Sequence, residues 1–357
     1  MIYITKTYLP DKERFKTYVD KIYHSGWITN NGQMVRELEE RLKEYLGVKN
    51  IVLVSNGTLA LQLAYKSLEL KGEVITTPFS FVATTSSLIW QGLEPVFVDI
   101  DSETLNIDVN KIESAISEKT SCIVPVHVFG NVCDVEKIGA IARAHNISVI
   151  YDAAHAFGVK YKGKSVLNYG DISILSLHAT KLFHTIEGGA IITNDDKLCE
   201  KIRLMINFGI ADTENIKTLG INAKMNEFQA AMGLCVLEDI DYIIQKRKQI
   251  HAYYKDNLPP ALTYQKHHCH SELNYAYFPI IFEDENTLLR VKNNLIKRGI
   301  LPRRYFYPSL DKLPYVHAIV EVSVAVNIST KILCIPIYPS LKLEEQKQII
   351  NAIKASI

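Results

Sequence analysis

The sequence predicts an α/β protein with a mostly parallel sheet sandwiched by helices, followed by a smaller α/β domain. First, short β-branched runs alternate with helically periodic segments between residues 73 and 151, a pattern typical of βαβ units. Second, a length of 357 residues accommodates about two domains. Third, a shorter series of strands and helices follows near the C-terminus. We therefore expect a large domain over residues 1–240, with its boundary near Asp241, and a small domain over residues 241–357.

The expected elements begin with residues 1–9, which are short, polar and aromatic and predict an arm rather than a strand of the main sheet. A break over residues 26–32 separates helices at 11–25 and 34–46. Strands are expected at 51–54, 74–77, 95–100, 122–128 and 148–151, and helices at 59–68, 80–90, 110–116, 135–145 and 196–207. A long helix opens within residues 220–233 and reaches about residue 254. The small domain is expected to contain strands at 276–282, 301–306 and 332–337 and helices at 285–298 and 343–355.

The composition excludes several classes of protein. Lys and Arg total 40 against 39 Asp and Glu, so the net charge of +1 gives no electrostatic basis for binding nucleic acid or an anionic membrane. No apolar run approaches the length of a membrane span. The six cysteines are scattered without a CxxC pair, which favours reduced thiols and a cytoplasmic location. Residues 158–165 match GxxxxGK[ST], but no helix is expected directly after them, as a P-loop requires, and GxGxxG does not occur. A P-loop or Rossmann nucleotide binder is therefore disfavoured.

The stretch from residue 151 to 194 carries the strongest chemical signal. Asp152 follows the apolar run 149–151 and is expected at the carboxyl end of a strand, where a partly buried carboxylate needs a cation. Ser176 and Lys181 follow in Ser-Leu-His-Ala-Thr-Lys, and a lysine that loses water becomes a better nucleophile. A carboxylate, a hydroxyl and an amine together suit pyridoxal 5′-phosphate, through its ring nitrogen, phosphate and aldehyde respectively. Considered alone, Asp152 is equally consistent with an N-cap or a loop residue, and a lone lysine such as Lys181 is usually a solvated surface charge.

A second candidate for the cofactor's phosphate lies earlier in the chain. Strand 51–54 runs through Ser-Asn-Gly-Thr at 55–58 into a helical pattern. A helix N-terminus offers free N–H groups and the positive end of a dipole, which bind anions. An ordinary N-cap is the alternative interpretation of the same residues.

These motifs, in this order, resemble the sugar-nucleotide aminotransferases of the DegT and StrS type, a branch of the aspartate-aminotransferase-like, fold-type I enzymes that use pyridoxal phosphate. The resemblance covers nearly the whole chain. It implies that Lys181 forms the internal aldimine and that Asp152 pairs with the pyridinium nitrogen. Around the phosphate it places Gly57, Thr58 and Ser176.

The resemblance also assigns residues that the sequence pattern alone would place in the core or at a helix start. Phe81, in Thr-Pro-Phe-Ser-Phe-Val-Ala-Thr, is expected to stack on the cofactor ring. His155 stands where many members have glutamine, and is expected to hydrogen-bond the cofactor's 3-hydroxyl. Asn222 matches an asparagine that reaches the cofactor phosphate of the neighbouring subunit, which implies an obligatory homodimer with shared active sites. Lysine at 181, where related dehydratases carry histidine, favours transamination.

For the reaction, the resemblance implies L-glutamate as the amino donor and a nucleotide-linked keto-6-deoxy sugar as the acceptor. The segments 176–189 and 303–308 are most similar to members that convert dTDP-4-keto-6-deoxy-D-glucose to dTDP-4-amino-4,6-dideoxy-D-glucose for surface polysaccharide such as O-antigen. The alternatives are a 3-keto sugar aminotransferase on the same scaffold and a catalytically silent regulator that binds pyridoxal phosphate.

The expected substrate contacts rest on fewer residues. Related enzymes place the loop with Trp27 and Thr29 near the active site. Arg303 could meet the pyrophosphate and Tyr305 could flank the sugar or base, while Arg303 and Arg304 serve equally well as rim charges with structural roles.

A run of potential metal ligands, His-His-Cys-His, occupies residues 267–270. Side chains in a continuous run do not easily converge on one ion without ligands from elsewhere, and no such spacing is evident. We expect an exposed loop there and no metal site.

Overall fold

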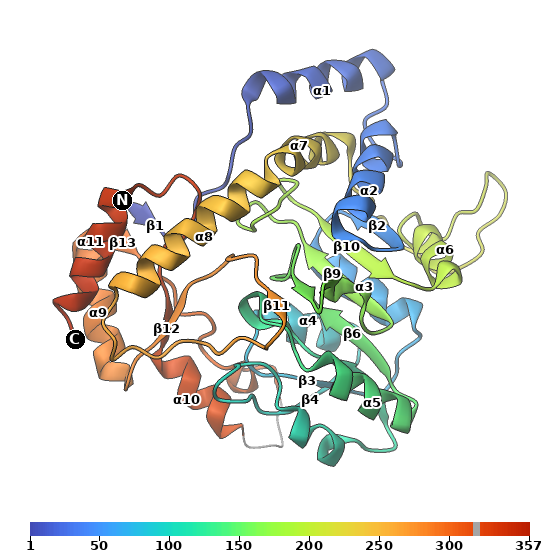
Figure 1. Cartoon of the computed structure of the whole chain (residues 1–357). Coiled ribbons are helices and arrows are strands. Elements are labelled where there is room, and N and C mark those ends of the chain that lie inside the picture. The colour runs from blue at the N-terminus through green and yellow to red at the C-terminus, as the bar shows by residue number, and fades with distance from the viewer. Residues whose placement is uncertain (317–321) are drawn as a thin grey trace.

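A seven-stranded sheet forms the centre of the computed structural model, which describes residues 1–316 and 322–357 (Figure 1). The strand order is β2-β10-β9-β6-β5-β3-β4. Only β10 runs antiparallel to its neighbours, so the sheet is mostly parallel, as the sequence predicts. The strands are β2 (Asn50–Val54), β3 (Glu73–Thr76), β4 (Glu94–Phe97), β5 (Thr120–Val124), β6 (Ser148–Asp152), β9 (Ile172–Ser176) and β10 (Gly189–Thr193).

Helices cover both faces of this sheet because its strands are apolar on both faces. Alternate residues of β2 show the pattern: Ile51 and Leu53 join one hydrophobic cluster, and Val52 and Val54 join another. The first face packs against α2 (Gln33–Leu46), α5 (Val135–His145) and α7 (Glu227–Glu238), and the second against α3 (Gly57–Ser67) and α6 (Asp196–Met205). Helix α4 (Val82–Trp90) packs against α3 and β4, and α1 (Lys12–Ser25) packs on α7.

The C-terminal elements pack around a hydrophobic cluster of their own. They comprise α8 (Ile240–Asn257), β12 (Pro279–Ile281), α9 (Glu285–Lys297), β13 (Ile300–Leu301), β14 (Ile332–Cys334) and α11 (Leu343–Lys354). Helix α10 (Ser323–Lys331) packs against α9, but its buried residues join another cluster that also contains residues of the large part. The N-terminal strand β1 (Ile2–Tyr3) pairs with β13 rather than with the main sheet, so the prediction of an arm is confirmed. A small sheet of β7 (Lys160–Tyr161), β8 (Lys164–Ser165) and β11 (Ser271–Glu272) joins the two parts of the chain.

Several predicted elements are wrong in extent, and proline explains some of these differences. Strand β5 stops before Pro125 and β13 before Pro302, because proline donates no backbone hydrogen bond to a neighbouring strand. The helix expected at 110–116 is two short 3₁₀ turns, η1 (Val109–Lys111) and η2 (Glu113–Ala115), since so short a segment gains little from helix formation. Strand β9 and helix α10 were not predicted.

The long helix expected to open within residues 220–233 and to reach about residue 254 is instead two helices. It begins only at Glu227, because the side chain of Asn226 caps the N–H of Gln229 and the Gln229 side chain accepts from the Asn226 N–H. Asp239 then separates α7 from α8.

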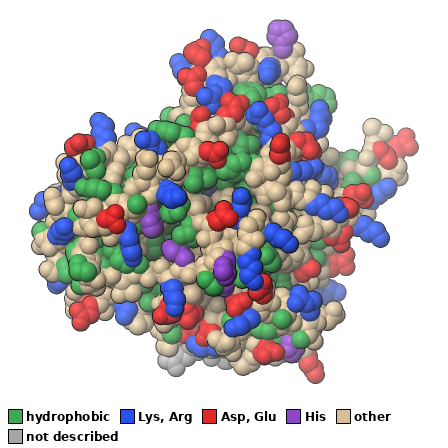
Figure 2. Space-filling view, in the orientation of Figure 1, with side chains coloured by type: hydrophobic (Ala, Val, Ile, Leu, Met, Phe, Trp, Pro, Cys, Tyr) green, Lys and Arg blue, Asp and Glu red, His purple; other side chains and the backbone are tan. Residues whose placement is uncertain are grey.

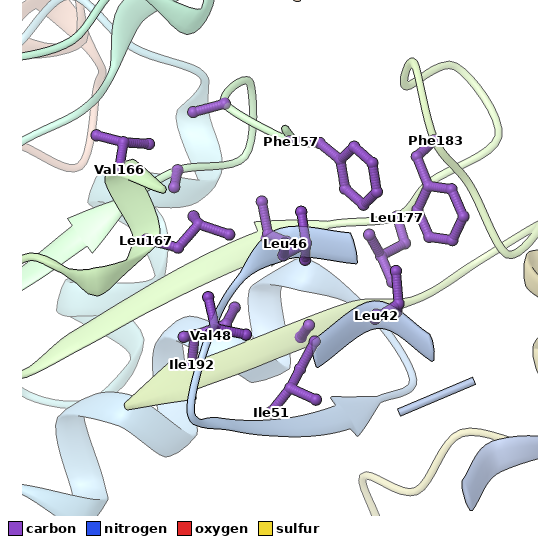
Figure 3. Packing of buried hydrophobic residues seen from close by; sticks show 14 of the residues in the cluster. Leu42, Leu46, Val48, Ile51, Phe157, Val166, Leu167, Leu177, Phe183 and Ile192 are labelled. Atoms are coloured by element: carbon purple, nitrogen blue, oxygen red, sulfur yellow. The ribbon is translucent and has the colours of Figure 1, made fainter. Parts of the chain in front are cut away.

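The core beneath the loop between β9 and β10 fixes the segment that carries Lys181. Figure 3 shows Leu177 and Phe183, which lie in this loop on either side of Lys181, pointing into the hydrophobic cluster. Both side chains are fully buried, and Phe183 stacks on Phe157 with ring centroids 4.4 Å apart. The loop is therefore anchored by apolar packing on both sides of Lys181.

None of the described helices combines the length and apolar character that a bilayer crossing requires. Among the described residues, no group of three or more His, Cys, Asp or Glu side chains is arranged to hold a metal ion. The six cysteines are free, and only Cys269 is exposed. Positive and negative side chains are interspersed on the face shown in Figure 2.

Candidate active site

A cavity of about 300 Å³ lies where several parallel strands end at the same edge of the sheet. Its walls also include residues of the C-terminal part of the chain, from segments 276–278, 303–306 and 334–337. Nine of the predicted site residues line it: Gly57, Thr58, Phe81, Asp152, His155, Ser176, Lys181, Arg303 and Tyr305. Residues far apart in the sequence thus share one enclosed space.

Asp152 is the last residue of β6, and its carboxylate is buried at the cavity wall. Burial raises the pKa of Asp152, while three contacts oppose the rise. The Thr84 hydroxyl donates to Oδ2 at 2.7 Å, the Ala154 N–H donates to Oδ1 at 3.1 Å, and the charge of Lys181 favours the ionised form. Lone pairs of the carboxylate remain for a further cationic donor in the cavity.

Lys181 lies in the loop between β9 and β10, within the same cavity. Burial lowers the pKa of its amine from 10.5 to about 8; the negative charge of Asp152 opposes this shift, and the positive charge of Arg303 adds to it. The Nζ atom donates to the hydroxyl of Tyr277 at 3.3 Å. A larger fraction of this amine is therefore neutral, and nucleophilic, near neutral pH than in an ordinary lysine.

The anion-binding end of the cavity is the N-terminus of α3. The Asn56 side chain accepts the N–H of Leu59 at 2.8 Å, so the cap interpretation of this turn is correct. The first N–H groups of a helix have no acceptor within it, which leaves those of Gly57 and Thr58 available at the cavity that both residues line. The N-cap and the anion site therefore coexist in one turn.

Two glycines allow the backbone to approach closely at this end. A Cβ on Gly57 would lie 3.0 Å from the Cβ of Ser176, whose hydroxyl also faces this region. A Cβ on Gly189 would lie 2.5 Å from the carbonyl oxygen of Asn56, a separation that real Cβ atoms do not show. Because glycine has no Cβ, positions 57 and 189 allow the turn and Ser176 to approach closely around one small space.

His155 is a neutral hydrogen-bond donor in the cavity. Its Nδ1 accepts the N–H of Phe129 at 3.2 Å, so we assign the ring proton to Nε2. Burial, followed by the charge of Lys181, lowers the pKa of His155 well below its ordinary value. The ring lies parallel to that of Phe306, with centroids 5.8 Å apart.

Phe81, which directly precedes α4, keeps about half of its surface exposed at the cavity.

Arg303 and Arg304, to which the sequence assigned the same two alternative roles, have different surroundings. Arg303 lines the cavity, with its guanidinium 4.5 Å from the ring centre of Tyr305. Arg304 lies outside it, donating to Glu285 at 2.7 Å and to the Thr330 carbonyl at 3.0 Å. The contacts of Arg304 are thus those of a structural residue, whereas a substrate role for Arg303 stays a prediction.

Three predicted residues do not line the cavity of this chain. Trp27 is exposed and Thr29 is half-buried, both in the break between α1 and α2. Asn222 is exposed, in a segment where it pairs with Asn207. The structure of one chain therefore leaves their predicted roles untested. The 267–270 run also lies outside this cavity, and most of it is exposed.

Sequence reasoning missed Thr84 and Tyr277 as site residues. Thr84 belongs to the same Phe-Val-Ala-Thr motif as Phe81, one helical turn later, so its spacing was an available signal. Tyr277 lies 96 residues from Lys181, and no local pattern connects the two positions.

The comparisons with known proteins agree with this site. The model of the DegT/DnrJ/EryC1/StrS aminotransferase family matches residues 10–354. The chain belongs to this family. It is 44% identical to the dTDP-4-amino-4,6-dideoxy-D-glucose transaminase of Shigella dysenteriae, over 99% of this chain and 98% of that protein. The protein of the same name in Escherichia coli is also 44% identical, over 96% and 95%.

Solved structures of sugar aminotransferases share the fold. The structure of DesI in the presence of its TDP-sugar product superposes with a TM-score of 0.94 and 31% identity, covering 99% of this chain and 92% of that one. This chain is thus a pyridoxal phosphate-dependent sugar aminotransferase.

The residues present fit pyridoxal phosphate. A carboxylate suits its ring nitrogen, and a desolvated amine suits its aldehyde. The N–H groups at the start of α3 and the hydroxyl of Ser176 suit its phosphate. The glycines at 57 and 189 leave space that a Cβ atom would fill.

The depressed pKa of Lys181 gives a direct test on cofactor-free protein. The rate at which trinitrobenzenesulfonate labels Lys181, followed by peptide mass spectrometry, should rise with pH through a midpoint near the pKa of about 8. Arg303→Gln should move this midpoint to higher pH, because it removes a positive charge that lowers the pKa. Arg304→Gln serves as the control, since Arg304 lies outside the cavity. A midpoint near the ordinary value of 10.5 would contradict the desolvated setting.

Proposed function

We propose that this aminotransferase moves an amino group from L-glutamate to dTDP-4-keto-6-deoxy-D-glucose and so forms dTDP-4-amino-4,6-dideoxy-D-glucose. The observation that carries the proposal is the 44% identity, over nearly the full length of both chains, to a transaminase named for that product. The geometry is consistent with it, because the amine of Lys181, the carboxylate of Asp152 and the N-terminus of α3 meet at one cavity.

In this proposal the chain contributes a proton acceptor, one fixed negative charge and a set of neutral donors to the phosphate. Bound pyridoxal phosphate supplies a ring that accepts electrons when a Cα–H bond of the donor breaks. Lys181 takes the Cα proton through its neutral Nζ, which its lowered pKa makes available. Asp152 keeps a negative charge beside the ring nitrogen. The N–H groups of Gly57 and Thr58 and the hydroxyl of Ser176 hold the phosphate and so fix the orientation.

For the sugar nucleotide we propose that Arg303 binds the pyrophosphate and that Tyr305 flanks the sugar or base. The stacked pair, with 4.5 Å between the guanidinium and the ring centre, supports this role because stacking presets the orientation of the arginine. Arg303 also lies close enough to influence Lys181, so the proposed pyrophosphate site adjoins the reacting amine.

We also propose a homodimer in which each subunit completes the active site of the other. Asn222 lies outside the cavity of its own chain, on a segment with several exposed apolar side chains. These are Phe208, Ile210, Ile216, Leu219 and Ile221. A cluster of exposed apolar residues is typical of an interaction surface, and a partner subunit would bury it while bringing Asn222, and the loop of Trp27 and Thr29, to a second cavity.

Within each subunit we propose that residues 1–240 and 241–357 act as a large and a small domain. The helix break at Asp239 falls at this boundary, and the C-terminal elements have a separate hydrophobic cluster. The cavity is lined from both parts, so a relative movement of the two would open or close it.

Product analysis tests the reaction. Protein incubated with pyridoxal phosphate, L-glutamate and the 4-keto dTDP-sugar should yield the 4-amino sugar nucleotide by mass and NMR, whereas the 3-keto isomer should react poorly. Lys181→Ala should lower turnover by at least about 10²-fold, because it removes the group that transfers the proton. A 3-amino product would move the assignment to the 3-keto alternative. No product from either sugar would favour the silent regulator instead.

Subunit complementation tests the shared site. Lys181→Ala and Asn222→Ala homodimers should both be impaired, the second by about tenfold or more because a hydrogen bond to a charged group is lost. A purified heterodimer with one variant on each subunit should recover about half of the wild-type activity, because one of its two sites is intact. A heterodimer no more active than the Asn222→Ala protein would show that each site belongs to one chain.

A further inference from the structure

A chain of hydroxyl groups leads from α4 to the buried carboxylate of Asp152. The Thr84 hydroxyl lies 2.7 Å from Asp152 Oδ2, and the Ser80 hydroxyl lies 2.7 Å from that of Thr84. Ser80 is 2% exposed, Thr84 is 0% exposed and Asp152 is 5% exposed. The low exposed fractions leave little of the two hydroxyls open to water.

The ionised carboxylate fixes the direction of this chain. A carboxylate without a proton can only accept, so the single proton of the Thr84 hydroxyl points to Oδ2. The Thr84 oxygen then accepts from Ser80, and every donor in the chain points toward Asp152. Aligned donors of this kind stabilise negative charge where the local dielectric constant is low.

The backbone holds Thr84 rigidly in this role. Phe81 directly precedes the first residue of α4, and its carbonyl accepts the N–H of Thr84 at 3.1 Å. The same first turn of α4 thus presents Phe81 and Thr84 to the cavity, which both residues line. The other carboxylate oxygen, Oδ1, is held separately by the N–H of Ala154 at 3.1 Å.

We propose that Thr84, supported by Ser80, is a positioning residue for Asp152: the hydroxyl chain holds the carboxylate in its charged form and in the orientation that meets the cofactor's ring nitrogen. The inference rests on the proposed role of Asp152 at that nitrogen. Thr84 touches neither substrate nor cofactor in this scheme. It acts by offsetting the cost of burying a charge that Lys181 alone does not neutralise.

The neighbouring threonine provides a matched control. Thr85 is also fully buried on α4, and its hydroxyl has no hydrogen-bond partner in the described part of the chain. Thr84→Val and Thr85→Val make the same chemical change one residue apart, and only the first removes a donor to Asp152. Thr84→Ser keeps the hydroxyl and serves as the conservative rescue.

The test reads the protonation of the ring nitrogen directly. Each protein is loaded with pyridoxal phosphate labelled with ¹⁵N in the ring, and the nitrogen chemical shift is measured by NMR. In Thr84→Val the resonance should move toward the unprotonated position, and the rate of the half-reaction with L-glutamate should fall by about tenfold. In Thr84→Ser and Thr85→Val both quantities should stay close to those of the wild type.

Asp152→Asn separates failure of this inference from failure of the proposed function. If Asp152→Asn moves the resonance but Thr84→Val behaves like Thr85→Val, the role of Thr84 is overturned and that of Asp152 stands. If Asp152→Asn leaves the resonance unchanged, the proposed function of the site fails as well. Should Thr84→Val not take up the cofactor, Ser80→Ala should move the resonance by a smaller amount in the same direction, and no movement would overturn the inference.

Discussion

The site depends on one electrostatic pairing across a desolvated cavity: the carboxylate of Asp152 and the amine of Lys181. Burial disfavours the charged form of both groups, raising the pKa of the acid and lowering that of the amine. Each partly offsets the effect of burial on the other. The donors to Asp152 and the charge of Lys181 favour a carboxylate, and burial favours a nucleophilic amine, which are the two groups that pyridoxal phosphate chemistry requires.

The fold produces this pairing through the topology of the sheet. Strands β6 and β9 are parallel neighbours, so Asp152 at the end of one and Ser176 at the end of the other lie at the same edge. The antiparallel strand β10 pairs with β9, so the loop with Lys181 begins and ends at this same edge of the sheet. Leu177 and Phe183 anchor that loop in the core. Hydrophobic packing under the sheet edge thus sets the position of the reactive amine.

Much of the large sheet could be predicted because its signals are local. Buried parallel strands form apolar runs, and Asp152 follows such a run directly in the sequence. Strand β9, which ends at Ser176, was missed although residues 172–177 are also largely apolar. The strand ends at Pro125 and Pro302 could also have been read from the sequence, since proline donates no ladder hydrogen bond. By contrast, the contact of Tyr277 with Lys181 depends on how the C-terminal part packs on the sheet, which no local pattern encodes. The different surroundings of Arg303 and Arg304 depend on the same tertiary packing.

Borohydride reduction tests most directly whether Lys181, the amine of this pairing, holds the cofactor. Protein supplied with pyridoxal phosphate, reduced with sodium borohydride and digested, should carry the pyridoxyl mass on the peptide that contains Lys181 and on no other peptide. The same treatment of Asp152→Asn should label the same lysine, because the acid governs the ring and not the attachment. A label on a different lysine, or none on Lys181, would contradict an arrangement in which Lys181 and Asp152 hold opposite ends of one cofactor.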